Sequence, residues 1–185
     1  MTIVETKHPG YVTGTWDVDP GGSYVGFVIR HLMIAKIRGQ FDSVCGEIVT
    51  ADDMLESSVA VTIDAASFHT SDAAKNERVT SPAFLDAERY PSLTFVSTGI
   101  HADHGLFLIE GDLTIRGVTN PVVLNATPPQ FGPNQAGART LGISAHTRIR
   151  RSEFGVDINE PMAGGGFVLG EDVDVVLEIE AAIRQ

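Results

Sequence analysis

Residues 173–183 read VDVVLEIEAAI, and this stretch decides the fold. Apolar residues fill every second position from 173 to 179, whereas Asp174, Glu178 and Glu180 stand on the opposite face. Successive side chains of a β-strand point to opposite sides of its sheet. The pattern therefore predicts a strand with one buried and one solvated face, as in an antiparallel sheet.

The same period of two recurs along most of the chain. It is found in residues 23–31, 36–49, 59–68, 93–101, 106–116, 118–126 and 140–151. Short connections, such as the polar turn at 102–105, join these segments. About eight strands of this kind can pair into a sandwich or close into a barrel. Long strands and short connections favour an all-β, eight-stranded, antiparallel up-and-down barrel, which also removes exposed sheet edges.

Residues 71–90 break the alternation and predict a short helical insert. Ser71 or Asp72 is suited to be the N-cap of a first helix. Residues 81–86 predict a second short helix, with Pro82 at its first position. Pro91 then ends the insert, and the strand pattern resumes.

Length and charge narrow the classes of protein. The 185 residues fit a leader at 1–14 followed by one barrel domain at 15–185. A net charge of −11 repels phosphate backbones, so no nucleic-acid partner is expected. Arg148, Arg150 and Arg151 are interpreted as the solvated face of one strand. No secretory signal and no apolar run of about 20 residues is present, which predicts a cytoplasmic protein without stable membrane insertion.

The sequence predicts no metal site, cofactor or catalytic residue. Cys45 is the only cysteine and is interpreted as a small buried apolar residue in a strand. His101 and His104 form an H-x-x-H pattern across a predicted turn, where they lack the further ligands that zinc requires. No nucleophile elbow, phosphate-binding loop or dinucleotide fingerprint occurs.

Five motifs in order give the chain a resemblance to a known family. They are FVIRHLM at 27–33 leading to RGQF at 38–41, IDAAS at 63–67, YPSLTF at 90–95, GDLTIRGVT at 111–119 and RSEFG at 151–155. Together they resemble the YceI-like proteins from about Trp16 to the C-terminus. The resemblance implies a lipocalin-like barrel with a helical insert. It also implies an elongated cavity that binds polyisoprenoids and other amphiphilic, lipid-like molecules.

Two groups of residues are candidates for binding such a ligand. The apolar candidates for the barrel interior are Phe27, Ile29, Phe41, Val61, Ile63, Phe95, Phe107, Ile109 and Leu113. The alternative for them is a dry, packed core. The candidates for the cavity end are His31, Phe68, Lys75, Arg78 and Phe84. Phe68 and Phe84 would gate the mouth of the cavity. His31 would form a hydrogen bond to the head group of the ligand, and Lys75 and Arg78 would bind an anionic head group.

The insert departs from the family pattern. Residues 75–79 read KNERV where the family often has Arg-Asp-x-His-Leu, so a His and an Asp are absent. The identity of the head group is therefore left open.

The resemblance favours binding or transport of an isoprenoid- or fatty-acid-like molecule. A second hypothesis is a non-metal enzyme that acts on an apolar substrate in the same cavity, although no acid–base pair stands out. A third is a packed barrel that acts through its surface, with a homodimer as one form of assembly.

Overall fold

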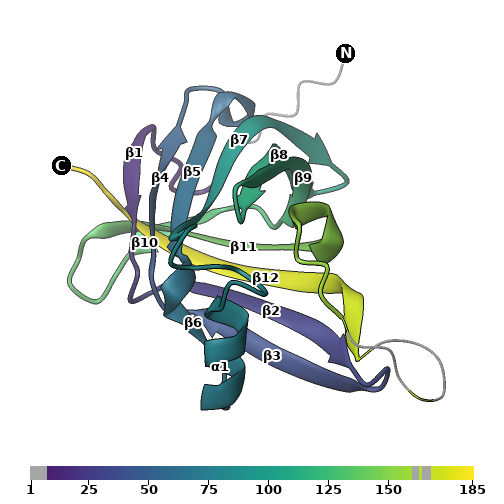
Figure 1. The fold of residues 1–185 in the computed structure, drawn as a ribbon. Helices are drawn as coiled ribbons and strands as arrows, with labels where there is room; N and C mark the ends of the chain where they lie inside the picture. Colours follow the sequence, from purple (N-terminus) through teal and green to yellow (C-terminus); the bar gives the residue numbers. More distant parts are fainter. Residues whose placement is uncertain (1–7, 160–162, 164–167) are drawn as a thin grey trace.

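The computed structural model describes residues 8–159, 163 and 168–185 (Figure 1). Within these residues strands predominate, with one α-helix and three short 3-10 helices. The strands are β1 Gly14–Val18, β2 Tyr24–His31, β3 Ala35–Phe41, β4 Val44–Thr50, β5 Ser58–Asp64, β6 Phe68–His69, β7 Ser92–Asp103, β8 Leu106–Ile115, β9 Val118–Ala126, β10 Gln130–Pro133, β11 Arg139–Arg150 and β12 Leu169–Ile183. The helices are α1 Ala73–Thr80, η1 Met54–Glu56, η2 Ala65–Ser67 and η3 Arg151–Phe154.

Eight strands close into an antiparallel barrel. The ring runs β1–β4–β5–β7–β8–β9–β11–β12 and returns to β1. The last two strands of the chain are paired continuously, from Thr140 opposite Ala182 to Arg150 opposite Asp172. The predicted eight-stranded antiparallel barrel with a short helical insert is therefore confirmed.

A second hairpin extends this ring. β12 pairs with β1 through residues 181–183 and with β2 through residues 169–178. β2 then pairs with β3, and β3 with the short β6. In Figure 1 the β2–β3 hairpin reaches away from the upper strands, and α1 lies beside it. The barrel is thus prolonged at the end where the insert lies.

The insert forms one helix instead of the two that the sequence predicts. Asp72 caps α1, because its carboxylate accepts hydrogen bonds from the backbone N–H of Ala74 (3.0 Å) and Lys75 (3.4 Å). Residues 81–86 form tight turns. The N–H groups of Leu85 and Asp86 bond back to the carbonyls of Val79 and Ser81 (both 2.9 Å). These bonds fold the chain onto the end of α1, so no second helix begins.

The strand register places Cys45 on the outside, which corrects its interpretation as buried. Val44 and Ile48 point inward and are only 2% and 6% exposed. Cys45 lies between inward positions and is exposed. Alternation along β4, and not side-chain polarity, decides its position.

Gly46 marks a place where β4 and β5 approach closely. A Cβ at this position would lie 2.2 Å from the carbonyl oxygen of Ala60, and the φ angle is 154°. The backbone of β5 cannot move away without breaking its pairing with β4 and β7. Only glycine fits here without distortion.

We expect Gly46→Ala to lower the free energy of unfolding by about 2 kcal/mol or more, because the added methyl group overlaps backbone atoms. Gly142→Ala in β11 is the matched control, since a Cβ there meets nothing within 4 Å. Chemical denaturation compares the two variants. Equal stability of both would show that β4 and β5 do not approach as closely as described.

Candidate functional site

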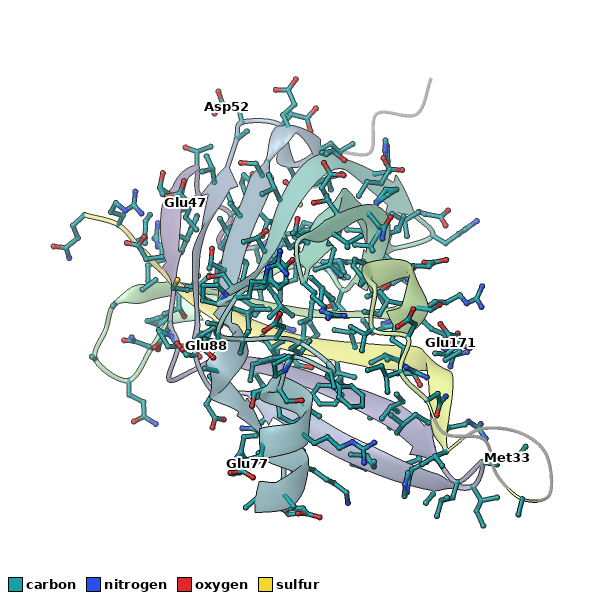
Figure 2. All side chains as sticks on the ribbon, in the orientation of Figure 1. Met33, Glu47, Asp52, Glu77, Glu88 and Glu171 are labelled. Carbon is teal, nitrogen blue, oxygen red and sulfur yellow. The ribbon has the colours of Figure 1, made fainter. Side chains whose placement is uncertain are left out.

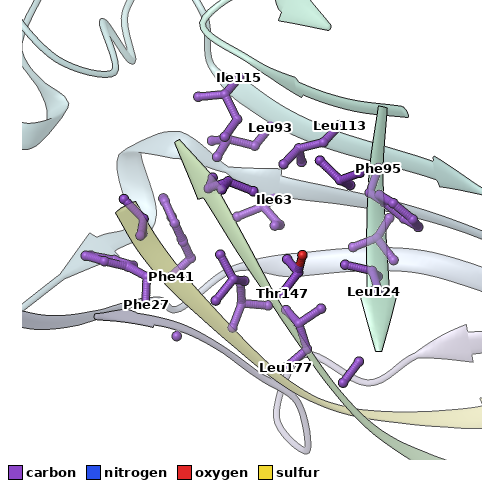
Figure 3. Close-up of a pocket in the computed structure, with 18 of the residues that line it drawn as sticks. Phe27, Phe41, Ile63, Leu93, Phe95, Leu113, Ile115, Leu124, Thr147 and Leu177 are labelled. Carbon is purple, nitrogen blue, oxygen red and sulfur yellow. The ribbon is translucent and has the colours of Figure 1, made fainter. Parts of the chain in front are cut away.

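The barrel encloses a cavity of about 390 Å3. Its volume falls within the usual range for small-molecule sites, about 300–1,000 Å3. Figure 3 shows side chains from opposite strands of the ring pointing into it. The labelled lining residues are Phe27, Phe41, Ile63, Leu93, Phe95, Leu113, Ile115, Leu124, Thr147 and Leu177.

Aliphatic and aromatic groups make up nearly all of the cavity wall. In the described part of the chain, the charged residues that line it are Lys75, Arg78 and Arg151. All three are basic, and no Asp or Glu belongs to the described lining. The described wall is therefore apolar almost throughout, and the charged residues that border it are basic.

The three basic residues lie at the same end of the barrel. Lys75 and Arg78 belong to α1, and Arg151 begins η3. Arg116 ties these two regions together, because its guanidinium donates to the carbonyls of Pro82 (2.9 Å) and Gly155 (2.6 Å). The cavity is thus chemically asymmetric along its length.

All fourteen residues predicted to bind a ligand line this cavity. Strand parity brings the nine interior residues together. The insert contributes Lys75, Arg78 and Phe84, whereas His31 and Phe68 come from β2 and β6. Their lining positions are features of the structure, and ligand binding by them remains a proposal.

Aromatic side chains pack against one another at the end near the insert. The rings of Phe27 and Phe68 stack with centroids 5.0 Å apart, and Phe41 packs edge-on against Phe68 at 5.7 Å. Phe84 is 6% exposed, and the guanidinium of Arg78 lies 5.6 Å from its ring centroid. The predicted gate residues Phe68 and Phe84 are therefore buried, packed parts of the wall.

Lys75 and Arg78 are three residues apart, so both lie on one face of α1. Lys75 forms an ion pair with Asp72 at 3.5 Å, and its side chain is 44% exposed. It therefore contacts both the cavity and solvent. A cation in this position can meet a charged group that remains hydrated while an attached chain is buried.

Arg151 is a site residue that the sequence interpretation missed. It was grouped with Arg148 and Arg150 as solvated, but it is only 6% exposed. Its guanidinium donates to the carbonyls of Gly170 (2.8 Å), Val156 (2.8 Å) and Ile158 (3.0 Å). A signal was present, because residue 151 continues the inward parity of 141–149.

Neighbouring bonds fasten η3 to β12. Glu171 accepts hydrogen bonds from the hydroxyl and the backbone N–H of Ser152, the latter at 3.0 Å. These bonds, the hydroxyl bond first, and the nearby charge of Arg151 lower the pKa of the Glu171 carboxyl. Arg151 and the next residue, Ser152, are therefore both hydrogen-bonded to β12.

Strands β11 and β12 supply further residues of the cavity lining that are not among the fourteen predicted ligand-binding residues. They are Ile143, Thr147, Ile149, Val173, Val175, Leu177 and Ile179. The period-two pattern identified their face. The closed ring was needed to show that this face borders a space and not a packed core.

The predicted H-x-x-H histidines lie on the surface. His101 is 3.4 Å from Glu110, and His104 is 3.5 Å from Asp103. Among the residues that the structure describes, no three His, Cys, Asp or Glu side chains gather as metal ligands would. None of the helices in the described residues is long and apolar enough to cross a membrane.

The closed ring, the helical insert and the apolar interior define a lipocalin-like β-barrel with an internal cavity. A model of the YceI-like domain matches residues 16–181, so the chain belongs to the YceI-like family.

Known proteins support this assignment. A UPF0312 protein of Vibrio cholerae is 30% identical over 145 residues, which cover 76% of this chain and 77% of the relative. The crystal structure of Burkholderia cenocepacia BcnA gives a TM-score of 0.75 at 27% identity, covering 89% of this chain and 99% of that one. A polyisoprenoid binding domain from Saccharophagus degradans gives 0.67 at 16% identity, covering 94% and 100%.

We expect Arg151→Met to lower the free energy of unfolding by about 2–4 kcal/mol, because three carbonyl groups lose their buried donor. Arg150→Met is the control, since Arg150 is exposed, and it should change stability by about 0.5 kcal/mol or less. Denaturant titration measures both. An Arg151→Met variant as stable as Arg150→Met would mean that the guanidinium is not a structural fastening.

Proposed function

We propose that this protein binds an amphiphilic molecule with a long isoprenoid- or fatty-acid-like chain inside the barrel. One observation carries the proposal: an apolar cavity whose described charged lining residues are all basic and lie at one end. A chain without hydrogen-bonding groups fits the wall, and an anionic head group fits the basic end.

The apolar wall argues against a polar ligand. A sugar or nucleotide placed there would lose its hydrogen bonds to water and find few partners, at a cost of several kcal/mol. A hydrocarbon chain loses nothing of this kind and gains about 25 cal/mol per Å2 of apolar surface buried. Part of that gain is offset by the entropy lost on binding.

The basic end favours a carboxylate or phosphate as the head group. Lys75 and Arg78 provide two positive charges from one face of α1, and Arg151 adds a third nearby. No Asp or Glu belongs to the described lining, so an anion there meets a net attraction, which Asp72 beside Lys75 and Glu171 near Arg151 offset in part. The proposal does not distinguish a prenyl phosphate from a fatty acid.

Similarity to known proteins agrees with this proposal. The Saccharophagus degradans structure is described as a polyisoprenoid binding domain, and at 16% identity its likeness extends to the fold. The weight therefore rests on the cavity of this chain. Transport of the bound molecule, a cytoplasmic location, a homodimer, and the division into a leader at 1–14 and one domain at 15–185 remain part of the proposal.

Filling the cavity should weaken binding. Val61→Trp places a large ring on an inward position of β5, and Thr62→Trp places the same ring on the exposed outer face. We expect Val61→Trp to weaken binding of a fluorescent fatty acid by about tenfold or more, because the chain loses its space. Thr62→Trp should bind like the unchanged protein.

Native mass spectrometry of freshly purified protein gives the same comparison without a chosen probe. A bound species of a few hundred daltons, as expected for a single acyl or prenyl chain, should be present in the unchanged protein and in Thr62→Trp, and absent in Val61→Trp. Equal occupancy in both variants would place the ligand outside the barrel and refute the proposal.

The basic end should select the head group. We expect the double variant Lys75→Gln/Arg78→Gln to weaken binding of a long-chain fatty acid by about tenfold, because two favourable charges are lost. Binding of the alcohol with the same chain should change little. Isothermal titration with both ligands provides the test, with Arg89→Gln as a control away from the cavity lining. Equal losses for acid and alcohol would contradict head-group recognition by charge.

A further inference from the structure

The β2–β3 hairpin ends in an apolar tip on the surface. Leu32, Met33 and Ile34 connect the two strands and are 45%, 58% and 90% exposed. Figure 2 shows Met33 at the far end of the hairpin, away from the ring. Ile34 therefore buries almost no surface, and Leu32 and Met33 each leave about half of theirs in solvent.

The tip is built in an unfavourable backbone conformation. Leu32 and Met33 have φ angles of 51° and 67°, in the left-handed region where side chains with a Cβ are disfavoured. In the β7–β8 hairpin, His104 and Gly105 adopt the same left-handed conformation, with φ angles of 46° and 83°. Glycine or asparagine would suit the tip better. Backbone strain of this kind is a pointer to function when it is observed directly.

The hairpin pairing holds this tip in place. Arg30 pairs opposite Lys36, and His31 opposite Ala35. The backbone N–H of Leu32 also donates to the carbonyl of Val168 at 2.8 Å. The apolar residues are therefore presented by an ordered element.

Positive charge surrounds the tip. Residues 24–41 contain Arg30, Lys36 and Arg38 and no acidic residue, although the whole chain has a net charge of −11. All three basic residues are exposed, on the face opposite the cavity. The local charge is thus opposite in sign to that of the molecule.

Acidic residues of β12 lie near these cations, since Gly170, which precedes Glu171 and Asp172, lies against Arg30, and Asp174 pairs opposite Val28. The pKa of Asp174 is lowered, chiefly by its hydrogen bond from Arg148 at 2.7 Å and more weakly by Lys36 and Arg30. Asp174 therefore offsets part of the hairpin's charge, although its hydrogen bond is accepted from Arg148.

The tip lies near Arg151 at the basic end of the cavity, because Leu169 pairs with His31 and the carbonyl of Gly170 accepts a hydrogen bond from Arg151. Helix α1 lies nearer the other end of the hairpin, beside β6. Ile29, His31 and Ile37, within a few residues of the tip on β2 and β3, line the cavity. A surface bound by the tip would therefore lie close to the part of the cavity near Arg151.

We propose that the β2–β3 tip docks this protein on the surface of an anionic lipid bilayer. Leu32, Met33 and Ile34 enter the interfacial region, and Arg30, Lys36 and Arg38 face the lipid phosphates. A protein partner fits less well, because stable interfaces usually involve about 20–30 residues from each side. Docking is independent of the proposed cargo, since it requires only the outer surface of the hairpin.

Sedimentation of the full chain with vesicles tests the proposal. Protein-free vesicles with half phosphatidylglycerol should bind the unchanged protein, and pure phosphatidylcholine vesicles should bind it far less. Ile34→Asp should lower the partition constant by about tenfold or more. Val96→Asp, at an apolar position 52% exposed on β7, should bind like the unchanged protein.

Two further variants test the charges and the backbone strain of the hairpin and show whether a loss of binding reflects a loss of folding. Arg30→Gln/Lys36→Gln/Arg38→Gln should reduce binding on the order of a hundredfold at low salt, whereas Arg139→Gln should not. Leu32→Asn/Met33→Gly should raise the thermal unfolding midpoint by relieving the left-handed conformations, and should still weaken binding.

The proposal is overturned if the unchanged protein does not bind the anionic vesicles, or if Ile34→Asp binds them as well as Val96→Asp. If the unchanged protein does not bind the vesicles, a protein partner becomes the better explanation of the exposed tip. Native mass spectrometry on the same samples reports the bound molecule separately, so docking and cargo binding can each fail without the other.

Discussion

The structure depends on the double pairing of β12. This strand spans fifteen residues, and it pairs with β11 along one edge and with β1 and β2 along the other. Without it the sheet would be open, with unpaired backbone groups at both edges. Because β12 closes the ring, the apolar face of every ring strand is turned toward a common interior. The cavity, its lining and the positions of the insert and hairpin all follow from this closure.

The chemical asymmetry of the interior gives the barrel a direction. Apolar side chains cover the wall, and Lys75, Arg78 and Arg151 bring positive charge to one end. Arg151 has a second role, because its bonds to three carbonyls join η3 to the residues that follow and to β12. Structural fastening and charge are therefore combined in one side chain. The proposed ligand matches this arrangement, because it has a long apolar chain and an anionic head group at one end.

The β2–β3 hairpin combines two features that reduce stability. Apolar side chains remain in water, and two residues adopt left-handed conformations. Such features persist where function requires them. The hairpin's own inward residues line the cavity, so the proposed membrane contact and the proposed binding site share one structural element.

The sequence by itself determined the all-β class, the inward face of most of the long strands and the location of the insert, because alternation is a local property of β-structure. Parity alone correctly predicted that Phe27, Val61 and Leu113 point inward. Three outcomes needed the tertiary structure. The turns at 81–86 arise from hydrogen bonds back to α1, and Cys45 is exposed because register overrides polarity. Arg151 is buried because carbonyls from distant segments converge on it. Whether the interior is hollow or packed depends on how the ring closes, and no single strand contains that information.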